Sequence, residues 1–178
     1  MNFPELLTAR NAHFVEDGFS KALTIAPSQR TTIIGCVDPR VDPMDVLGLS
    51  PGEAVVVRNV GGRVTPSLLE TLAILRIVAQ ATGAAMDAGW NLILLQHTDC
   101  GIKRCLCGAP QLLAHHLGVP EQDLSRLAID DPYAAVEVDI ATLKQHPGLP
   151  MGLCVTGMVY DVATGKVDIV APPSLLHD

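Results

Sequence analysis

Short apolar runs alternate with longer stretches of mixed polarity along the chain, and this alternation predicts its secondary structure. The runs are rich in β-branched and aliphatic residues, which is typical of strands, and the three in the first hundred residues read as buried. The last two runs flank Ala163-Thr164-Gly165, where glycine suits a tight turn, so they predict a hairpin. The expected strands cover 32–37, 53–58, 91–96, 153–160 and 166–170.

Between these strands, apolar residues recur at helical spacing. Thr65 and Pro66 have the residue types of a helix N-cap and first position, Gly83 is a stop signal, and Asp131-Pro132 opens another helix. The expected helices cover 5–23, 66–82, 110–117 and 132–144. Strands alternating with helices predict an α/β fold, a mainly parallel β-sheet flanked by helices, with an antiparallel hairpin at its C-terminal edge.

Composition supports one globular domain over residues 1–178, with a helical arm over 1–25. Apolar residues make up 48% of the chain and charged residues 17%, a balance that argues against disorder. The aromatic share is only 3%, so the core must be built from aliphatic side chains. Such a core suits a parallel sheet that is covered on both faces.

Charge and hydropathy exclude several classes of partner. Twelve basic against nineteen acidic residues give a net charge of −7, which argues against a nucleic-acid surface. No apolar run approaches the roughly 18–20 residues that span a bilayer, so no membrane partner is expected. The first 14 residues lack the apolar centre of a signal peptide, and we expect a cytoplasmic protein. Its five cysteines are then expected to be thiols or metal ligands.

Reactive side chains follow the predicted strands where each strand ends. Cys36 lies at the end of the first strand, and His97 and Cys100 follow the third. In a parallel sheet these ends meet at one edge, where ligands bind. Two thiols and an imidazole are a common zinc-binding set that leaves one coordination place for water or a carboxylate. Asp38 and Arg40 follow the first strand and are expected at the same edge.

Several neighbours of this set have expected supporting roles. Gly101 allows the backbone to come close and can aim its N–H at a bound oxygen. Gln96 is a candidate to support the metal ligands by a hydrogen bond. Asp99 is expected to be solvated or to cap a helix. The segment 58–62 is glycine-rich but lacks phosphate-loop spacing, so no nucleotide or other organic cofactor is expected.

Three motifs together resemble the β-carbonic anhydrases. They are C-V-D-P-R at 36–40, R-N-V-G-G at 58–62 and H-T-D-C-G at 97–101, and they match the family pattern C-x-D-x-R and H-x-x-C in order and spacing. The resemblance covers about residues 30–105 and extends more weakly to 160–166. It implies that Cys36, His97 and Cys100 hold Zn²⁺. It also implies that Asp38 either coordinates the resting metal or pairs with Arg40.

The same resemblance implies an enzyme, a zinc-dependent carbonic anhydrase. Its reaction would be zinc-hydroxide catalysed, reversible hydration of CO2 to bicarbonate, with Asp38, Arg40 and Gly101 as catalytic residues. Zinc can lower the pKa of bound water to about 7. The compact chain also resembles the subgroup that includes carbonyl sulfide and carbon disulfide hydrolases, and this activity is an alternative. A non-catalytic zinc or thiol sensor is a third. The resemblance further implies a homodimer or homotetramer.

The remaining cysteines and histidines have less specific interpretations. Cys105 and Cys107 are either spare thiols on a loop, or ligands of a second metal, or redox-sensitive thiols. They are poorly placed to form a disulfide with each other. Cys154 lies in a predicted strand and is expected in the core. His115 and His116 are interpreted as a solvated helix face, with proton shuttling as the alternative.

Overall fold

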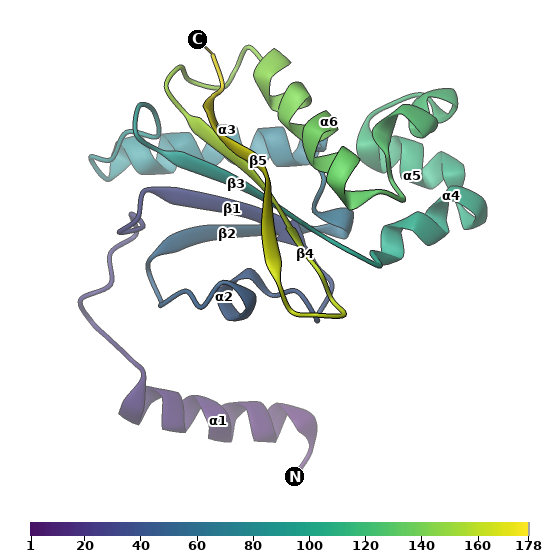
Figure 1. The fold of residues 1–178 in the computed structure, drawn as a ribbon. Coiled ribbons are helices and arrows are strands. Elements are labelled where there is room, and N and C mark those ends of the chain that lie inside the picture. The colour runs from purple at the N-terminus through teal and green to yellow at the C-terminus, as the bar shows by residue number, and fades with distance from the viewer. Residues whose placement is uncertain (178) are drawn as a thin grey trace.

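The computed structural model describes residues 1–177 and is built around one five-stranded sheet (Figure 1). The strands are β1 (Thr31–Cys36), β2 (Ala54–Asn59), β3 (Asn91–His97), β4 (Cys154–Tyr160) and β5 (Val167–Leu175). They lie in the order β2-β1-β3-β4-β5, with the first four parallel and β5 antiparallel to β4. The predicted α/β fold, including its C-terminal edge hairpin, is therefore confirmed.

One helix precedes the first strand and the others connect the parallel strands. They are α1 (Phe3–Asp17), α2 (Pro43–Val46), α3 (Pro66–Ala81), α4 (Cys105–Gly108), α5 (Pro110–Leu117) and α6 (Pro132–Gln145), with 3₁₀ turns η1 (Val60–Gly62), η2 (Gly101–Arg104) and η3 (Glu121–Leu127). The capping signals work as predicted, since Thr65 Oγ1 accepts from the Leu68 N–H and the Asp131 carboxylate accepts from the first turn of α6. Sequence reasoning missed the single-turn elements, which are too short to show a period.

The main core lies between the sheet and the helices α3 and α6. Leu72 of α3 and Val136 of α6 join one buried cluster with strand residues such as Leu94. This core is almost wholly aliphatic, as the composition predicts. The second strand differs from its expectation, because β2 is half-exposed along its whole length rather than buried. It lies at the edge of the sheet, with only β1 beside it.

The first helix is shorter than predicted and makes little contact with the rest. It was expected over 5–23, but α1 ends at Asp17, where Gly18 caps it. Within residues 1–177, α1 buries no side chain, and Figure 1 shows it apart from the sheet. Phe14 and Val15 are therefore exposed. Among the same residues, no helix is both long and apolar enough to cross a lipid bilayer.

Strand register brings the reactive segments together. Cys36 pairs with Asn59 across β1 and β2, while Gly35 pairs with Leu95 across β1 and β3. The ends of these three strands are therefore level with one another. As a result, the loops that follow them share one edge of the sheet.

Candidate metal centre

Three potential metal ligands converge beyond the ends of β1 and β3. The Sγ atoms of Cys36 and Cys100 and a ring nitrogen of His97 all lie within 4.8 Å of one another. The two sulfur atoms are 3.8 Å apart. Cys36 and His97 are buried and Cys100 is half-buried. The structure thus brings together the three residues that the sequence nominated from two distant segments.

The donor set fits a tetrahedral zinc ion. Two sulfur ligands at about 2.3 Å from such an ion are roughly 3.8 Å apart, close to the spacing between Cys36 and Cys100. His97 Nδ1 lies 2.9 Å from the Thr98 carbonyl oxygen, which accepts its hydrogen. Its buried Nε2 has no hydrogen-bond partner among residues 1–177. An imidazole fixed in this way offers an unused lone pair, the usual arrangement of a histidine that binds a metal.

The two thiols differ in acidity because they interact directly. Cys100 acts as the hydrogen-bond donor, and this contact is the main reason that the pKa of Cys36 falls to about 4. The His97 ring and the backbone N–H groups of Asp38 and Gly61 lower the pKa of Cys36 further, against the effect of burial. The pKa of Cys100 is raised, by its bond to Cys36 and by burial. Of the two thiols, Cys36 is therefore the one that ionises more easily to a thiolate.

Asp38 is paired with Arg40 beside these ligands. Arg40 Nε and Nη2 donate to the two carboxylate oxygens of Asp38 at 3.0 and 2.7 Å, a bidentate arrangement. These hydrogen bonds lower the pKa of Asp38 to about 2. Arg40 therefore holds the Asp38 carboxylate beside the three potential ligands.

Asp99 is exposed, as expected of a solvated residue, and it also contacts two cationic side chains. Its carboxylate accepts from Arg40 Nη1 at 3.2 Å and from Lys103 Nζ at 2.9 Å, and its carbonyl accepts from Arg40 Nη2. The contacts with Lys103 and then Arg40 lower its pKa. Asp99 and Asp38 thus hold Arg40 together, and both accept from its Nη2. The signal for this role was its position between two candidate ligands, His97 and Cys100.

Arg58, at the end of β2, fixes the loop that carries Cys36 and Asp38. Its guanidinium donates to the carbonyl oxygens of both residues at 2.8 Å, and to Asp42 Oδ2 at 2.6 Å. One side chain therefore holds the turn after β1 by three hydrogen bonds. The sequence marked segment 58–62 only as a supporting element, and the structure gives Arg58 as the residue that does this.

The glycine pair after β2, Gly61 and Gly62, packs close to the end of β1, the strand that carries Cys36. Gly62 has a φ of +61°, and a Cβ placed there would lie 2.9 Å from the backbone nitrogen of Cys36. Gln96 Nε2 donates to the Gly62 carbonyl at 2.7 Å, so Gln96 supports the loop rather than a ligand directly. Asn59 closes the same loop, since its side-chain amide exchanges two hydrogen bonds with the backbone of Arg63.

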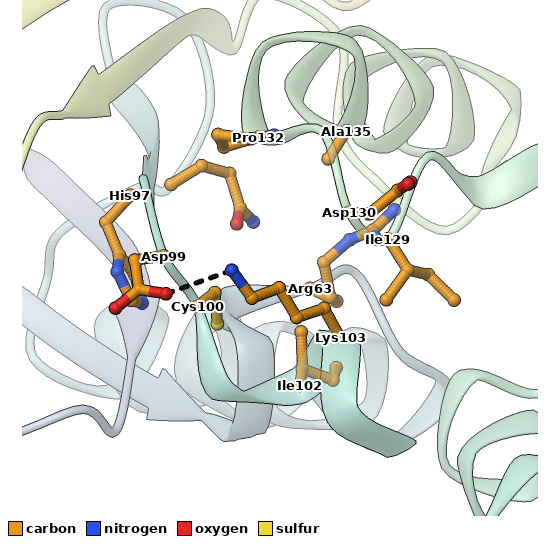
Figure 2. Close-up of a pocket in the computed structure, with 11 residues that line it drawn as sticks. Arg63, His97, Asp99, Cys100, Ile102, Lys103, Ile129, Asp130, Pro132 and Ala135 are labelled. Atoms are coloured by element: carbon orange, nitrogen blue, oxygen red, sulfur yellow. Dashed lines mark hydrogen bonds and ion pairs between the residues drawn. The ribbon is translucent and has the colours of Figure 1, made fainter. Parts of the chain in front are cut away.

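A buried ion pair that sequence reasoning missed lies beside the site. Arg63 Nε and Nη2 donate to Asp139 of α6 at 2.8 and 3.2 Å, and both residues are almost fully buried. Burial raises the pKa of Asp139, against the opposing effect of Arg63. Figure 2 shows Arg63 across a small pocket from His97 and Asp99. The pocket has a volume of about 10 Å³, room for about one water molecule.

The other nominated residues lie outside the trio. All five cysteines are free of disulfides within residues 1–177, and Cys105 and Cys107 do not join the ligand cluster. Cys154, expected in the core, is half-buried in β4. His116 is tied to η1, because its Nε2–H donates to the Val60 carbonyl at 3.1 Å. Gly101 opens η2, with open space where a side chain would be.

Fold and site together define an α/β protein with a Cys-His-Cys candidate metal centre at the carboxyl edge of a parallel sheet. A family model described as carbonic anhydrase matches residues 31–167. The chain is 30% identical to β-carbonic anhydrase 1 of Mycobacterium tuberculosis over 156 residues, which cover 87% of this chain and 90% of the relative. The chain belongs to the β-carbonic anhydrase family.

Two further relatives differ in the reaction for which they are named. A crystal structure of carbonic anhydrase from Streptococcus mutans has a TM-score of 0.71 and 32% identity, and covers 96% of this chain and 98% of that one. A carbon disulfide hydrolase of an Acidianus species is 24% identical over 168 residues, covering 80% of this chain and 78% of the relative. Relatives of this chain therefore include proteins named for two different reactions.

Proposed function

We propose that this protein binds Zn²⁺ through Cys36, His97 and Cys100 and catalyses the reversible hydration of CO2 to bicarbonate. The observation that carries the proposal is the Cys-His-Cys cluster, with atoms within 4.8 Å of one another, beside the bidentate pair of Asp38 and Arg40. Members of this family are zinc enzymes, and the donor set fits that ion. A bound Zn²⁺ supplies Lewis acidity, which makes hydroxide accessible near neutral pH.

The residues around the metal then orient the reactants. Asp38 is ionised at all working pH values, because its pKa is about 2, so its carboxylate can only accept hydrogen bonds. It accepts a hydrogen bond from the O–H of the reacting water and so directs a lone pair of the water oxygen toward the CO2 carbon. Arg40 keeps Asp38 in this position. The Gly101 N–H donates to a substrate oxygen, bicarbonate leaves, and the released proton passes to buffer.

Hydrolysis of carbonyl sulfide or carbon disulfide is the second candidate, which the carbon disulfide hydrolase relative favours. These substrates are also small, linear and uncharged. Stopped-flow CO2 hydration and sulfide release, measured on one zinc-loaded preparation, separate the two activities. Rapid CO2 hydration without sulfide release supports the proposal, and the reverse result favours the second candidate. Activity on neither substrate would favour a zinc or thiol sensor instead.

Substitution at Asp38 tests the assigned chemistry. Asp38→Asn preserves shape but removes the charge, so we expect retained zinc and a fall in kcat/KM of about a hundredfold or more. Asp168→Asn, on the exposed face of β5, is the matched control and should leave kcat/KM unchanged. Equal activity of Asp38→Asn and the control would refute the role of Asp38.

Substitution of thiols tests the assigned ligands. The double variant Cys105→Ser with Cys107→Ser should retain about one zinc ion per chain, because neither thiol lies in the cluster. Cys36→Ser should lose the metal, since thiolates are preferred zinc ligands. Zinc content measured by elemental analysis decides the point. If Cys36→Ser keeps its zinc and the double variant loses it, the proposal has named the wrong thiols as zinc ligands.

We further propose that the chain forms a homodimer or homotetramer. Helix α1 exposes several large apolar side chains, Phe3, Leu7, Phe14 and Val15. Light scattering of the full chain should therefore give a mass of two or four chains. Replacing Phe14 and Val15 by Ser should weaken the assembly. A monomer at micromolar concentration would contradict this proposal without affecting the proposed metal site.

A further inference from the structure

Four charged side chains of alternating sign form a row that begins beside the candidate metal centre and ends at the surface. They are Asp38, Arg40, Asp99 and Lys103, and successive members are 2.7, 3.2 and 2.9 Å apart. The side chain of Asp38 is only 14% exposed, whereas the other three are 42–56% exposed. Figure 2 shows Lys103, the outer member, reaching from η2 to Asp99. The proposed function uses only the inner pair, so the outer pair has no part in it so far.

Arg40 is shared between the two carboxylates of this row. It donates to Asp38 from Nε and Nη2 at 3.0 and 2.7 Å. It donates to the Asp99 carboxylate from Nη1 at 3.2 Å, and to the Asp99 carbonyl from Nη2 at 3.1 Å. The two acidic residues therefore bind different edges of one guanidinium. A movement of Arg40 toward Asp99 must lengthen its bonds to Asp38.

Lys103 limits how strongly Asp99 attracts Arg40. Its Nζ donates to Oδ1 of Asp99 at 2.9 Å, while Arg40 Nη1 donates to Oδ2. The negative charge of Asp99 is thus divided between two cations. Without Lys103 the whole charge would act on Arg40, and opposite charges at this distance attract one another even near the surface. Removal of Lys103 would therefore favour the contact of Arg40 with Asp99 over its contact with Asp38.

The backbone of Asp99 is held in an uncommon conformation that serves these contacts. Its φ is +53°, in the left-handed region that few residues other than glycine, asparagine and aspartate adopt. In this conformation its carbonyl and its carboxylate both accept from Arg40. Conformations of this kind persist where the surrounding structure fixes them, and they gather at functional sites. Because asparagine tolerates the same φ, Asp99→Asn removes the charge and leaves the backbone as it is.

We propose that Lys103 is a positioning residue, which acts through Asp99 to keep Arg40 on Asp38 and so keeps Asp38 off the metal. A half-buried carboxylate that loses its cation is left unpaired at a cost, and a metal ion bound to Cys36, two residues away in the chain, would replace that cation. Loss of Lys103 would thus favour Asp38 as the fourth ligand. The effect on catalysis rests on the proposed function, whereas the contacts of Arg40 do not depend on the ion.

The position of Arg40 tests the proposal without activity and without the metal. In crystals of the chelator-treated Lys103→Met variant, we expect a second conformer of Arg40 that is bonded to Asp99 and lies more than about 3.5 Å from Asp38, beyond a hydrogen bond. Lys103→Arg keeps the cation and should abolish this conformer. Lys144→Met, at an exposed lysine near the end of α6, is the matched control. If Arg40 keeps both bonds to Asp38 in Lys103→Met, the proposal is wrong.

Kinetics of the zinc-loaded variants test the consequence for the reaction. Lys103→Met should lower kcat/KM for CO2 by about two- to fivefold, the size of effect that an exposed ion pair has, and Lys103→Arg should restore it. In an Asp99→Asn background, Lys103→Met should have no effect, because its route to Arg40 is already removed. An equal fall in both backgrounds would overturn the proposal. Inactivity of the wild-type protein on CO2 would count against the proposed function instead, and the conformers of Arg40 would still decide the role of Lys103.

Discussion

The buried pair of Arg63 and Asp139 offers the most demanding test of how this fold is held together. Arg63 is 2% exposed and Asp139 3% exposed, and their hydrogen bonds join the loop after β2 to helix α6. Asp139→Asn keeps the shape of the side chain but removes its charge. The guanidinium would then remain buried without a counter-charge. Arg63 Nη1 already has no partner within residues 1–177, so the buried guanidinium is incompletely bonded even before the substitution.

The expected loss of stability is large. Removing one partner of a buried ion pair costs about 3–5 kcal/mol. The free energy of unfolding of a typical domain is only about 5–15 kcal/mol, so the loss is a substantial fraction. For a chain of this size, 1 kcal/mol corresponds to about 2–4 °C in Tm. We therefore expect Asp139→Asn to lower Tm by about 6–20 °C.

Calorimetry and urea denaturation at one fixed protein concentration measure this effect. Asp123→Asn is the matched control, because Asp123 is half-buried, its partner Arg126 is exposed, and their pair should contribute only about 0–1 kcal/mol. The double variant Arg63→Met with Asp139→Leu removes both charges and should recover most of the loss. If Asp139→Asn is no less stable than the control, the buried pair does not stabilise the fold as argued.

Three further predictions concern the metal centre. Gly62→Ala should cost about 1–3 kcal/mol more than Gly48→Ala and should reduce zinc content. Both glycines have positive φ, but only at Gly62 would the added Cβ meet the Cys36 backbone, and equal losses in urea denaturation would contradict this. Apparent zinc affinity should rise about tenfold per pH unit near neutral pH, because the raised pKa of Cys100 leaves a proton that zinc must displace. Competition with a chelator at several pH values checks the slope, and a flat profile would be inconsistent with it. Arg58→Lys should weaken zinc binding about 10–100-fold, because it loses the fixed geometry of three hydrogen bonds behind the ligands. Unchanged zinc affinity in a calorimetric titration would show that the loop after β1 keeps its conformation without Arg58.

The sequence was sufficient for the fold and for the meeting of Cys36, His97 and Cys100 because both depend on local signals. Thr65, Pro66 and Asp131 have strong positional preferences, and α3 and α6 begin where these residues predict. Cys36 and His97 follow apolar runs, and the register of a parallel sheet then leaves little choice about where they meet. These signals need no knowledge of distant contacts.

The features that the sequence did not predict depend on contacts across long stretches of chain. Arg63 and Asp139 are 76 residues apart, and nothing near either residue indicates that both are buried. Arg40 and Asp99, 59 residues apart, meet only because β1 and β3 are neighbours. The end of α1 at Asp17 was missed for a different reason. Apolar spacing continues to Leu23, but without a packing surface it does not extend the helix beyond Gly18.

The proposed ligand sulfurs lie at the end of β1 and three residues beyond β3, and this placement has a mechanical consequence. Cys36 and Cys100 are 64 residues apart in the chain, and an ion held by both closes that entire segment into a ring. While the ring is closed, β1 and β3 cannot separate at this end, so unfolding must either expel the ion or begin elsewhere. An ion bound by both sulfurs restricts the unfolded chain much as a long-range crosslink does. Loss of the ion would therefore destabilise the middle of the sheet. The protein would lose its metal-dependent activity and part of its stability at the same time.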